Sequence, residues 1–294
     1  MTQTLKRSLI ILLILALALA TILLFLSALL HFKPEMLARH LLRESGDVAA
    51  LFHPDHRSTD WPAWFQKQQP EWQVVEAALL TPWGEKMNPE RVLPEYPRPQ
   101  LRRDQWMNLN GLWSFNVVSR ETEKVEAFPG KILVPFSIEA PLSGVGRPLF
   151  AGERLWYQRS FELPDNWDTE HKILLNFGAV DYQAEVFVNN SKVGEHKGGY
   201  TPFSFDISAA LSESGLNSLV VAVWDPSNAD GATQQRGKQH INPANVFYTA
   251  TSGIWQTVWL EPVASTSISR VNVSTDIADG TAAVTVKFRG NPRG

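Results

Sequence analysis

Cysteine is absent from the 294 residues, and its absence excludes several kinds of site. Without cysteine there is no disulfide scaffold, no thiolate ligand for a metal and no cysteine nucleophile. Charge is also scarce, since charged residues make up 19% of the chain and the formal net charge is −3. A nucleic-acid-binding domain normally carries a basic patch, so we expect no nucleic-acid partner.

Signatures of common catalytic and ligand sites are missing as well. Neither the G-x-S-x-G pattern of serine hydrolases nor the H-E-x-x-H pattern of zinc peptidases occurs. The glycine-containing run 231–239 has a spacing one residue too long for a phosphate-binding loop, and it lacks the final hydroxyl residue. On residue types alone the sequence reveals no active site, and we assign no metal and no cofactor to it.

One long segment lacks charge entirely. Between Ser8 and Phe32 there is no Lys, Arg, Asp or Glu, and about 20 apolar residues suffice to cross a bilayer as a helix. A cleaved signal peptide is the competing interpretation, because residues 18–20 fit a cleavage site. Another apolar run follows at once, so we predict an uncleaved membrane anchor over 8–32 behind a flank of residues 1–7. The charges on its two sides are nearly balanced, so we place the C-terminal part in the periplasm or outside the cell on functional grounds.

A helical juxtamembrane segment is predicted for residues 33–79. Pro34 and Glu35 suit a first helical turn, and apolar residues follow at helical spacing. A second stretch, 61–80, is interrupted at Pro70. Its tryptophans either lie at the lipid headgroups or pack against a folded domain, and both interpretations stay open.

Aromatic residues and short alternating runs are abundant in the rest of the chain. There are 11 Trp, 15 Phe and 5 Tyr, and after a proline-rich lead-in the side chains alternate with a period of two. Asn189-Asn190 is typical of a two-residue hairpin turn. The strand candidates are 113–117, 131–136, 156–163, 173–177, 182–188, 218–224 and 255–261. Many short strands with little helix indicate an all-β sandwich or jelly roll over 80–263.

The alternating pattern restarts near Ala264. Two further strand candidates, 268–273 and 283–288, flank the turn at Asp279-Gly280. Two or three strands cannot bury a sheet face by themselves. We therefore expect residues 264–294 to form an incomplete second β domain.

Carboxylate pairs were considered because glycoside hydrolysis uses two of them. Asp181 and Glu185 share one side of an alternating run, which places them about 13 Å apart and too far for a retaining pair. We interpret them as part of a solvated outer face. Asp225 and Glu261 stand at strand ends, and the sequence identifies no partner for either.

A polar and aromatic loop, residues 237–259, is a candidate for sugar contact. Tryptophan and tyrosine faces stack on sugar rings, amide and acid groups bind hydroxyls, and loops between strands often carry function. An ordered surface loop anchored by Trp255 explains the same composition. On composition alone the two interpretations are equal.

Several longer blocks of sequence are specific when taken together. They are 96–100, 106–115, 132–136, 142–144, 155–161, 177–182, 186–189, 193–196, 198–203 and 252–261. In order and spacing they resemble glycoside hydrolase family 2, over roughly residues 80–262. The resemblance implies the family's N-terminal sugar-binding domain, a galactose-binding-like jelly roll, and residues 264 onward resemble the start of the immunoglobulin-like domain that follows it.

The resemblance also implies where function lies. In this family both catalytic glutamates lie on a later (β/α)₈ barrel, which needs about 250 residues, so no catalytic residue is assigned here. The loop before the last strand reaches toward that active site. This makes five residues candidates for glycan contact, namely Gln239, His240, Tyr248, Thr249 and Ser252.

We therefore expect the N-terminal portion of a membrane-anchored retaining enzyme that hydrolyses O-glycosyl bonds in carbohydrate metabolism. Its expected substrate is β-galactoside-like, and its partners are a β-glycoside and the membrane. The alternative is a membrane-tethered, lectin-like carbohydrate-binding module that has no barrel and no catalytic activity.

Overall fold

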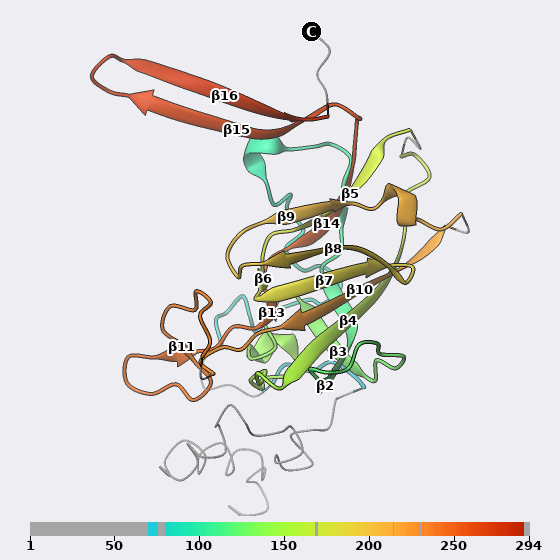
Figure 1. The fold of residues 1–294 in the computed structure, drawn as a ribbon, viewed down its shortest axis with the longest axis vertical. Coiled ribbons are helices and arrows are strands. Elements are labelled where there is room, and N and C mark those ends of the chain that lie inside the picture. Colours follow the sequence, from blue (N-terminus) through green and yellow to red (C-terminus); the bar gives the residue numbers. More distant parts are fainter. Residues whose placement is uncertain (1–69, 76–79, 168–169, 214, 230, 291–294) are drawn as a thin grey trace, which may run out of the picture. The chain divides into compact units, whose positions relative to one another are not determined.

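The computed structural model of the protein describes residues 70–75, 80–167, 170–213, 215–229 and 231–290 (Figure 1). The chain divides into two units, 1–52 and 53–294, and all of the described residues belong to the second. The predicted flank 1–7, the predicted anchor 8–32 and most of the predicted segment 33–79 lie outside the described residues. Within the described ranges, no helix has the length and apolar character that a membrane span requires.

Two antiparallel sheets form the body of the described domain. The larger sheet contains, in spatial order, β3 (Gly130–Val134), β2 (Gly111–Ser119), β4 (Glu153–Glu162), β10 (Leu216–Trp224), β7 (Gln183–Val188) and β8 (Ser191–Lys197). The smaller sheet contains β1 (Met107–Asn108), β14 (Val258–Val263), β5 (Lys172–Phe177) and β9 (Phe203–Asp206). In Figure 1, β4, β10, β7 and β8 run side by side. The all-β prediction is confirmed, and the arrangement is consistent with a jelly-roll sandwich.

Short elements connect and extend the sandwich. They are the pair β6 (Val180–Asp181) and β13 (Gly253–Ile254), the parallel pair β11 (Gln239–His240) and β12 (Tyr248–Thr249), and the 3₁₀ turns η3 (Pro99–Leu101), η4 (Pro141–Ser143) and η5 (Ser208–Ala210). A long hairpin follows, made of β15 (Ser267–Asp276) and β16 (Thr281–Arg289).

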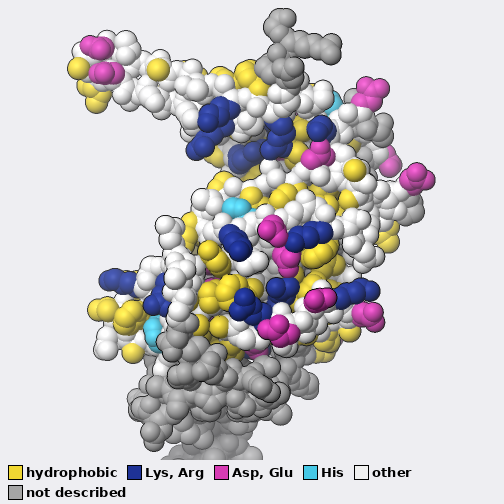
Figure 2. Space-filling view, in the orientation of Figure 1, with side chains coloured by type: hydrophobic (Ala, Val, Ile, Leu, Met, Phe, Trp, Pro, Cys, Tyr) yellow, Lys and Arg dark blue, Asp and Glu magenta, His cyan; other side chains and the backbone are white. Residues whose placement is uncertain are grey.

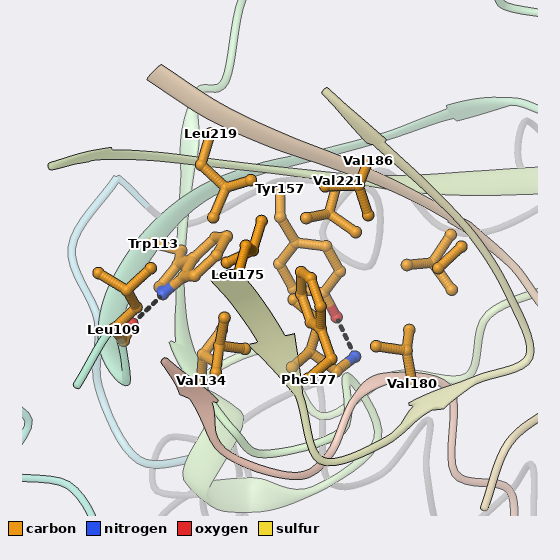
Figure 3. Packing of buried hydrophobic residues seen from close by; sticks show 14 of the residues in the cluster. Leu109, Trp113, Val134, Tyr157, Leu175, Phe177, Val180, Val186, Leu219 and Val221 are labelled. Atoms are coloured by element: carbon orange, nitrogen blue, oxygen red, sulfur yellow. Dashed lines mark hydrogen bonds between the residues drawn. The ribbon is translucent and has the colours of Figure 1, made fainter. Parts of the chain in front are cut away.

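The core lies between the inner faces of the two sheets, where the alternating pattern places its large apolar side chains (Figure 3). Trp113 and Tyr157 are both almost fully buried and meet edge to face. The indole Nε1 of Trp113 donates to the carbonyl of Leu109 at 2.8 Å, and the backbone N–H of Ile254 donates to the hydroxyl of Tyr157 at 3.2 Å. Each aromatic ring is therefore buried with a polar partner, which avoids the cost of an unpaired polar atom.

The predicted hairpin turn at Asn189-Asn190 is confirmed. Both residues have positive φ, at 51° and 66°, and they connect β7 to β8 with Val188 opposite Ser191. A two-residue turn of this kind needs positive φ at both positions, and asparagine tolerates it better than most residues.

The structure describes only residues 70–75 of the helical segment that was predicted for 33–79. These six residues are not helical, so the prediction is wrong for them. Their polar groups bond to the 3₁₀ turn η4 instead. The backbone N–H of Val75 donates to the carbonyl of Pro141 at 3.0 Å, and Trp72 Nε1 donates to that of Leu142 at 3.1 Å. Trp72 thus packs against the folded domain, which was one of the two open interpretations. The remainder of 33–79, apart from these six residues, lies outside the description.

The β15–β16 hairpin has two chemically different faces. By register, one face carries apolar cross-strand pairs, including Val271 with Val286 and Val273 with Val284. Several of these side chains are exposed, and Val273 and Val284 are about 60% exposed. The predicted strands and the turn at 279–280 are confirmed, and the identification of this hairpin with an immunoglobulin-like domain stays a prediction.

Candidate functional site

The loop between β10 and β14 brings four of the five predicted glycan-contact residues together. β11 and β12 pair in parallel, so that Gln239 lies opposite Tyr248 and His240 lies opposite Thr249. Tyr248 is 69% exposed, whereas Gln239 and His240 are partly buried. The pairing leaves a polar and aromatic surface at this end of the domain.

Gln239 is held by three hydrogen bonds. Its side-chain Nε2 donates to the hydroxyl of Tyr200 at 2.8 Å and lies 3.4 Å from Asp181 Oδ2. Its Oε1 accepts from the backbone N–H of Thr251 at 2.7 Å. The amide is therefore fixed beside the exposed Tyr200, and the exposed Tyr248 lies opposite Gln239 in the β11–β12 pair. We call these three residues the Gln239 patch.

Ser252 lies beneath this surface rather than on it. Its side chain is fully buried, and its hydroxyl donates to Asp225 Oδ2 at 2.7 Å. Its backbone N–H donates to Glu139 Oε2 at 2.9 Å. In this conformation Ser252 positions the end of the loop and does not face a ligand. Its predicted direct contact with a glycan is therefore not supported by the geometry.

His240 also supports the loop from within. The backbone N–H of Asn242 donates to its Nδ1 at 3.0 Å, and its ring lies 5.4 Å from that of Phe247. Thr249, opposite it, is exposed. Of the predicted residues, Gln239 thus has a side chain that is held in place and partly open to solvent, and Tyr248 has the most exposed side chain.

Three buried carboxyl groups lie under the Gln239 patch. Burial raises the pKa of Glu139 to about 8, and burial together with the nearby Asp225 raises the pKa of Asp181 to about 7. Burial also raises the pKa of Asp225. No Lys or Arg within the described ranges forms an ion pair with any of the three. We call these residues the neutral cluster, because burial favours the protonated form of each and no cation pairs with them in the described part of the chain.

The interpretation of Asp181 and Glu185 as one solvated face is wrong. The strand is interrupted at Tyr182, so that Asp181 pairs with β13 while Glu185 pairs with β10 and β8. Asp181 is buried. Glu185 is partly exposed and forms ion pairs with Arg154 and Lys192. An uninterrupted alternation cannot reveal such a change of sheet partner.

Asp225 and Glu261, for which the sequence identified no partner, both have several. Asp225 accepts from Ser252 and from the backbone N–H of Ser227. Glu261 accepts from Tyr96 at 2.8 Å and forms ion pairs with Arg98 and Arg103. Apart from Ser227, these partners are distant in the sequence, so the neighbouring residues carry no sign of them.

One signal for the buried site was present in the sequence, at Gly199. A Cβ on this residue would overlap the carboxylate of Asp181. The backbone carbonyl of Gly199 also accepts from Trp255 Nε1 at 2.7 Å. The Gly198-Gly199 pair thus lets Tyr200 approach both Asp181 and the loop, and a side chain at residue 199 would prevent it.

Comparison with known proteins bears on this site. The profile described as "Glycosyl hydrolases family 2, sugar binding domain" matches residues 106–262, which include the Gln239 patch and the neutral cluster. A β-galactosidase from Thermoanaerobacter pseudethanolicus is 31% identical over 134 residues, covering 45% of this chain and 17% of that protein. A β-glucuronidase from Felis catus is 27% identical over 218 residues, covering 64% of this chain and 33% of that protein.

A solved structure supports the same relationship. The β-glucuronidase of Faecalibacterium prausnitzii aligns with a TM-score of 0.50 at 26% identity, covering 67% of this chain and 37% of that one. The chain thus spans about a sixth to a third of the length of the two curated relatives.

Proposed function

This chain belongs to glycoside hydrolase family 2, and we propose that it supplies the accessory sugar-binding domain of an enzyme that hydrolyses β-glycosides. The observation that carries the proposal is the Gln239 patch within the matched domain. There, the exposed Tyr200 contacts an amide that is already held in place, and the exposed Tyr248 lies opposite this residue in the strand pair. Aromatic faces next to a fixed polar group suit a sugar ring, which presents C–H faces and hydroxyls together.

The neutral cluster favours an uncharged part of the substrate at this patch. A ligand that approaches Gln239 lies above carboxyl groups whose raised pKa values reduce their negative charge at neutral pH, so it meets hydrogen-bonding groups with less charge than ordinary carboxylates carry. We propose that the patch contacts sugar hydroxyls and that the catalytic acid and nucleophile are supplied from outside the described residues.

β-Glucuronides are the first substrates to test, and β-galactosides are the second. The β-galactoside expectation agrees with the name of one relative, but the relative that shares the longer alignment is named a β-glucuronidase. We also propose that residues 8–32 anchor the protein in a membrane with the sandwich outside the cytoplasm, supported by the absence of charge in that segment.

The proposal is tested by assaying the 294-residue chain and the product of the full native reading frame against chromogenic β-glucuronides and β-galactosides. We expect turnover in the membrane fraction for the full product and none for the 294-residue chain. Turnover by the purified 294-residue chain would contradict the assignment of catalysis to other residues. A full product that binds β-glycosides without hydrolysing them would favour the lectin-like alternative.

A further inference from the structure

A cleft that is separate from the Gln239 patch carries positive charge. It has a volume of about 690 Å³ and lies among η3, the β5–β9 end of the smaller sheet and the β15–β16 hairpin. Three arginines line it, namely Arg98, Arg270 and Arg289. In Figure 2, dark-blue Lys and Arg side chains gather along the hollow beside the hairpin. The volume is in the range of sites that hold small molecules, about 300–1,000 Å³.

The hairpin face at this cleft is cationic by register. Arg270 lies directly opposite Lys287, and Arg289 follows two residues later on the same side of β16. Like charges directly opposite each other destabilise a sheet. The hairpin's own acidic residues, Asp276 and Asp279, lie at its far end, by the turn. The pairing therefore concentrates positive charge without a local counter-charge.

The three arginines differ in the ion pairs and hydrogen bonds that they already form within the domain. Arg98 forms an ion pair with Glu261, which also pairs with Arg103. Arg289 donates one hydrogen bond, from Nη2 to Ser204 Oγ at 3.0 Å. Neither Arg270 nor Arg289 forms an ion pair with another residue in the described part of the chain. Guanidinium donors thus remain for an anionic ligand, and no acidic residue is among the described residues that line the cleft.

The other lining residues match a sugar rather than a bare anion. The exposed amides of Gln100 and Asn272 line the same cleft. Amides bind hydroxyls, and a guanidinium binds a carboxylate through two parallel hydrogen bonds. A uronic acid residue carries hydroxyls and a carboxylate on one ring.

We propose that this cleft is a second carbohydrate site that binds the carboxylate of a uronic acid residue in an acidic oligosaccharide. The site goes beyond the proposed function, because it shares no residue with the Gln239 patch. Arg270 and Arg289 hold the carboxylate, and the amides of Gln100 and Asn272 bind ring hydroxyls. The site would hold an acidic polysaccharide on this domain while the enzyme hydrolyses a different sugar residue of the same polysaccharide.

The test is calorimetric titration of the 294-residue chain with digalacturonic acid, its neutral dimethyl ester and inorganic phosphate. We expect the acid to bind, and we expect Arg270→Gln and Arg289→Gln each to weaken binding by about five-fold or more, because each removes a charged bidentate donor. The matched control is Lys172→Gln, since Lys172 is a cation on the same sheet that is already paired with Asp206. We expect this variant to keep the affinity of the unaltered chain.

Three results would each overturn the proposal. The acid could fail to bind, or the ester could bind as tightly as the acid. Phosphate could also bind as tightly with the same dependence on both arginines, which would make the cleft a general anion site. Melting curves of the arginine variants show whether each is folded, and the ring signals of Tyr96 give a second readout, because its hydroxyl lies 3.3 Å from Arg98 Nη2. Failure here would leave the test at the Gln239 patch unaffected.

Discussion

Buried carboxyl groups occur in two places in this domain, at Glu261 and in the neutral cluster, and the two places differ in the charge of the groups that contact the carboxyls. Glu261 is fully buried and is met by Arg98 and Arg103, which are 29% and 25% exposed, and by the hydroxyl of Tyr96. The neutral cluster is equally buried, yet only uncharged donors, such as Ser252, face it. Burial alone therefore does not determine the state of an acid. The partner decides whether the site is an ion pair or a hydrogen-bonded neutral group.

The two groups also lie beside different candidate ligand sites. The neutral cluster supports the Gln239 patch, whereas the Glu261 ion pairs hold Arg98 at the cationic cleft. The same residue type thus supports a nearly uncharged surface in one place and a positive one in the other. Variants that remove one carboxyl at a time test this contrast.

The largest effect is expected from Glu261→Gln. It leaves two partly buried arginines without their counter-charge and should lower the free energy of unfolding by about 3 kcal/mol. Breaking a buried ion pair costs about 3–5 kcal/mol, and the lower end applies here because the arginines reach solvent. Urea denaturation at neutral pH measures it. The matched variant is Glu139→Gln in the neutral cluster, which replaces a protonated carboxyl by a similar amide and should cost less than about 1 kcal/mol. Equal losses for the two variants would contradict the contrast.

Gly199→Ala is expected to have the next largest effect. The added Cβ would overlap the Asp181 carboxylate, and overpacking of this kind costs about 1–3 kcal/mol. The readout is again the midpoint of urea denaturation. Gly152→Ala serves as its control, because no atom lies within 4 Å of the Cβ that would be added there. A Gly199→Ala variant as stable as the control would show that the contact with Asp181 is loose.

The sandwich could be predicted from the sequence because its signals are local. Alternation within each strand and the asparagine pair at the β7–β8 turn depend on neighbouring residues alone. The five site candidates came from the family resemblance, and β11–β12 does bring four of them together. Composition by itself left that loop undecided.

What the sequence missed depends on partners distant in the chain. Glu261 and Arg98 are 163 positions apart, and Ser252 and Glu139 are 113 apart. Asp181 was assigned to the surface because its strand changes partner at Tyr182, which an alternating pattern hides. The helix expected for 70–75 failed for a similar reason, because its polar groups bond to η4.

A smaller effect is expected from pH. A carboxyl with a raised pKa in the folded state holds its proton there after the unfolded chain has lost it. The free energy of unfolding should therefore fall as pH rises through the raised values of about 7 for Asp181 and about 8 for Glu139. Each group contributes a slope of at most about 1.4 kcal/mol per pH unit.

Urea denaturation at several pH values between about 6.5 and 9 measures this slope, and Glu139→Gln should reduce it. Burial lowers the pKa of His196 below its ordinary value of about 6.5, so His196 acts in the opposite sense only near the lower end of this window. Stability that rises across this window would show that the cluster is ionised in the folded protein.

The most direct test of the central claim is NMR of the 294-residue chain with labelled tyrosine rings, titrated with methyl β-glucuronide and methyl β-galactoside. There are 5 Tyr in the chain, so the signals can be assigned by substitution. We predict that the ring signals of Tyr200 and Tyr248 shift while that of the buried Tyr157 does not, and that Gln239→Ala abolishes the shifts. Tyr200 and Tyr248 signals that stay unchanged with both glycosides would contradict the assignment of glycan contact to the Gln239 patch.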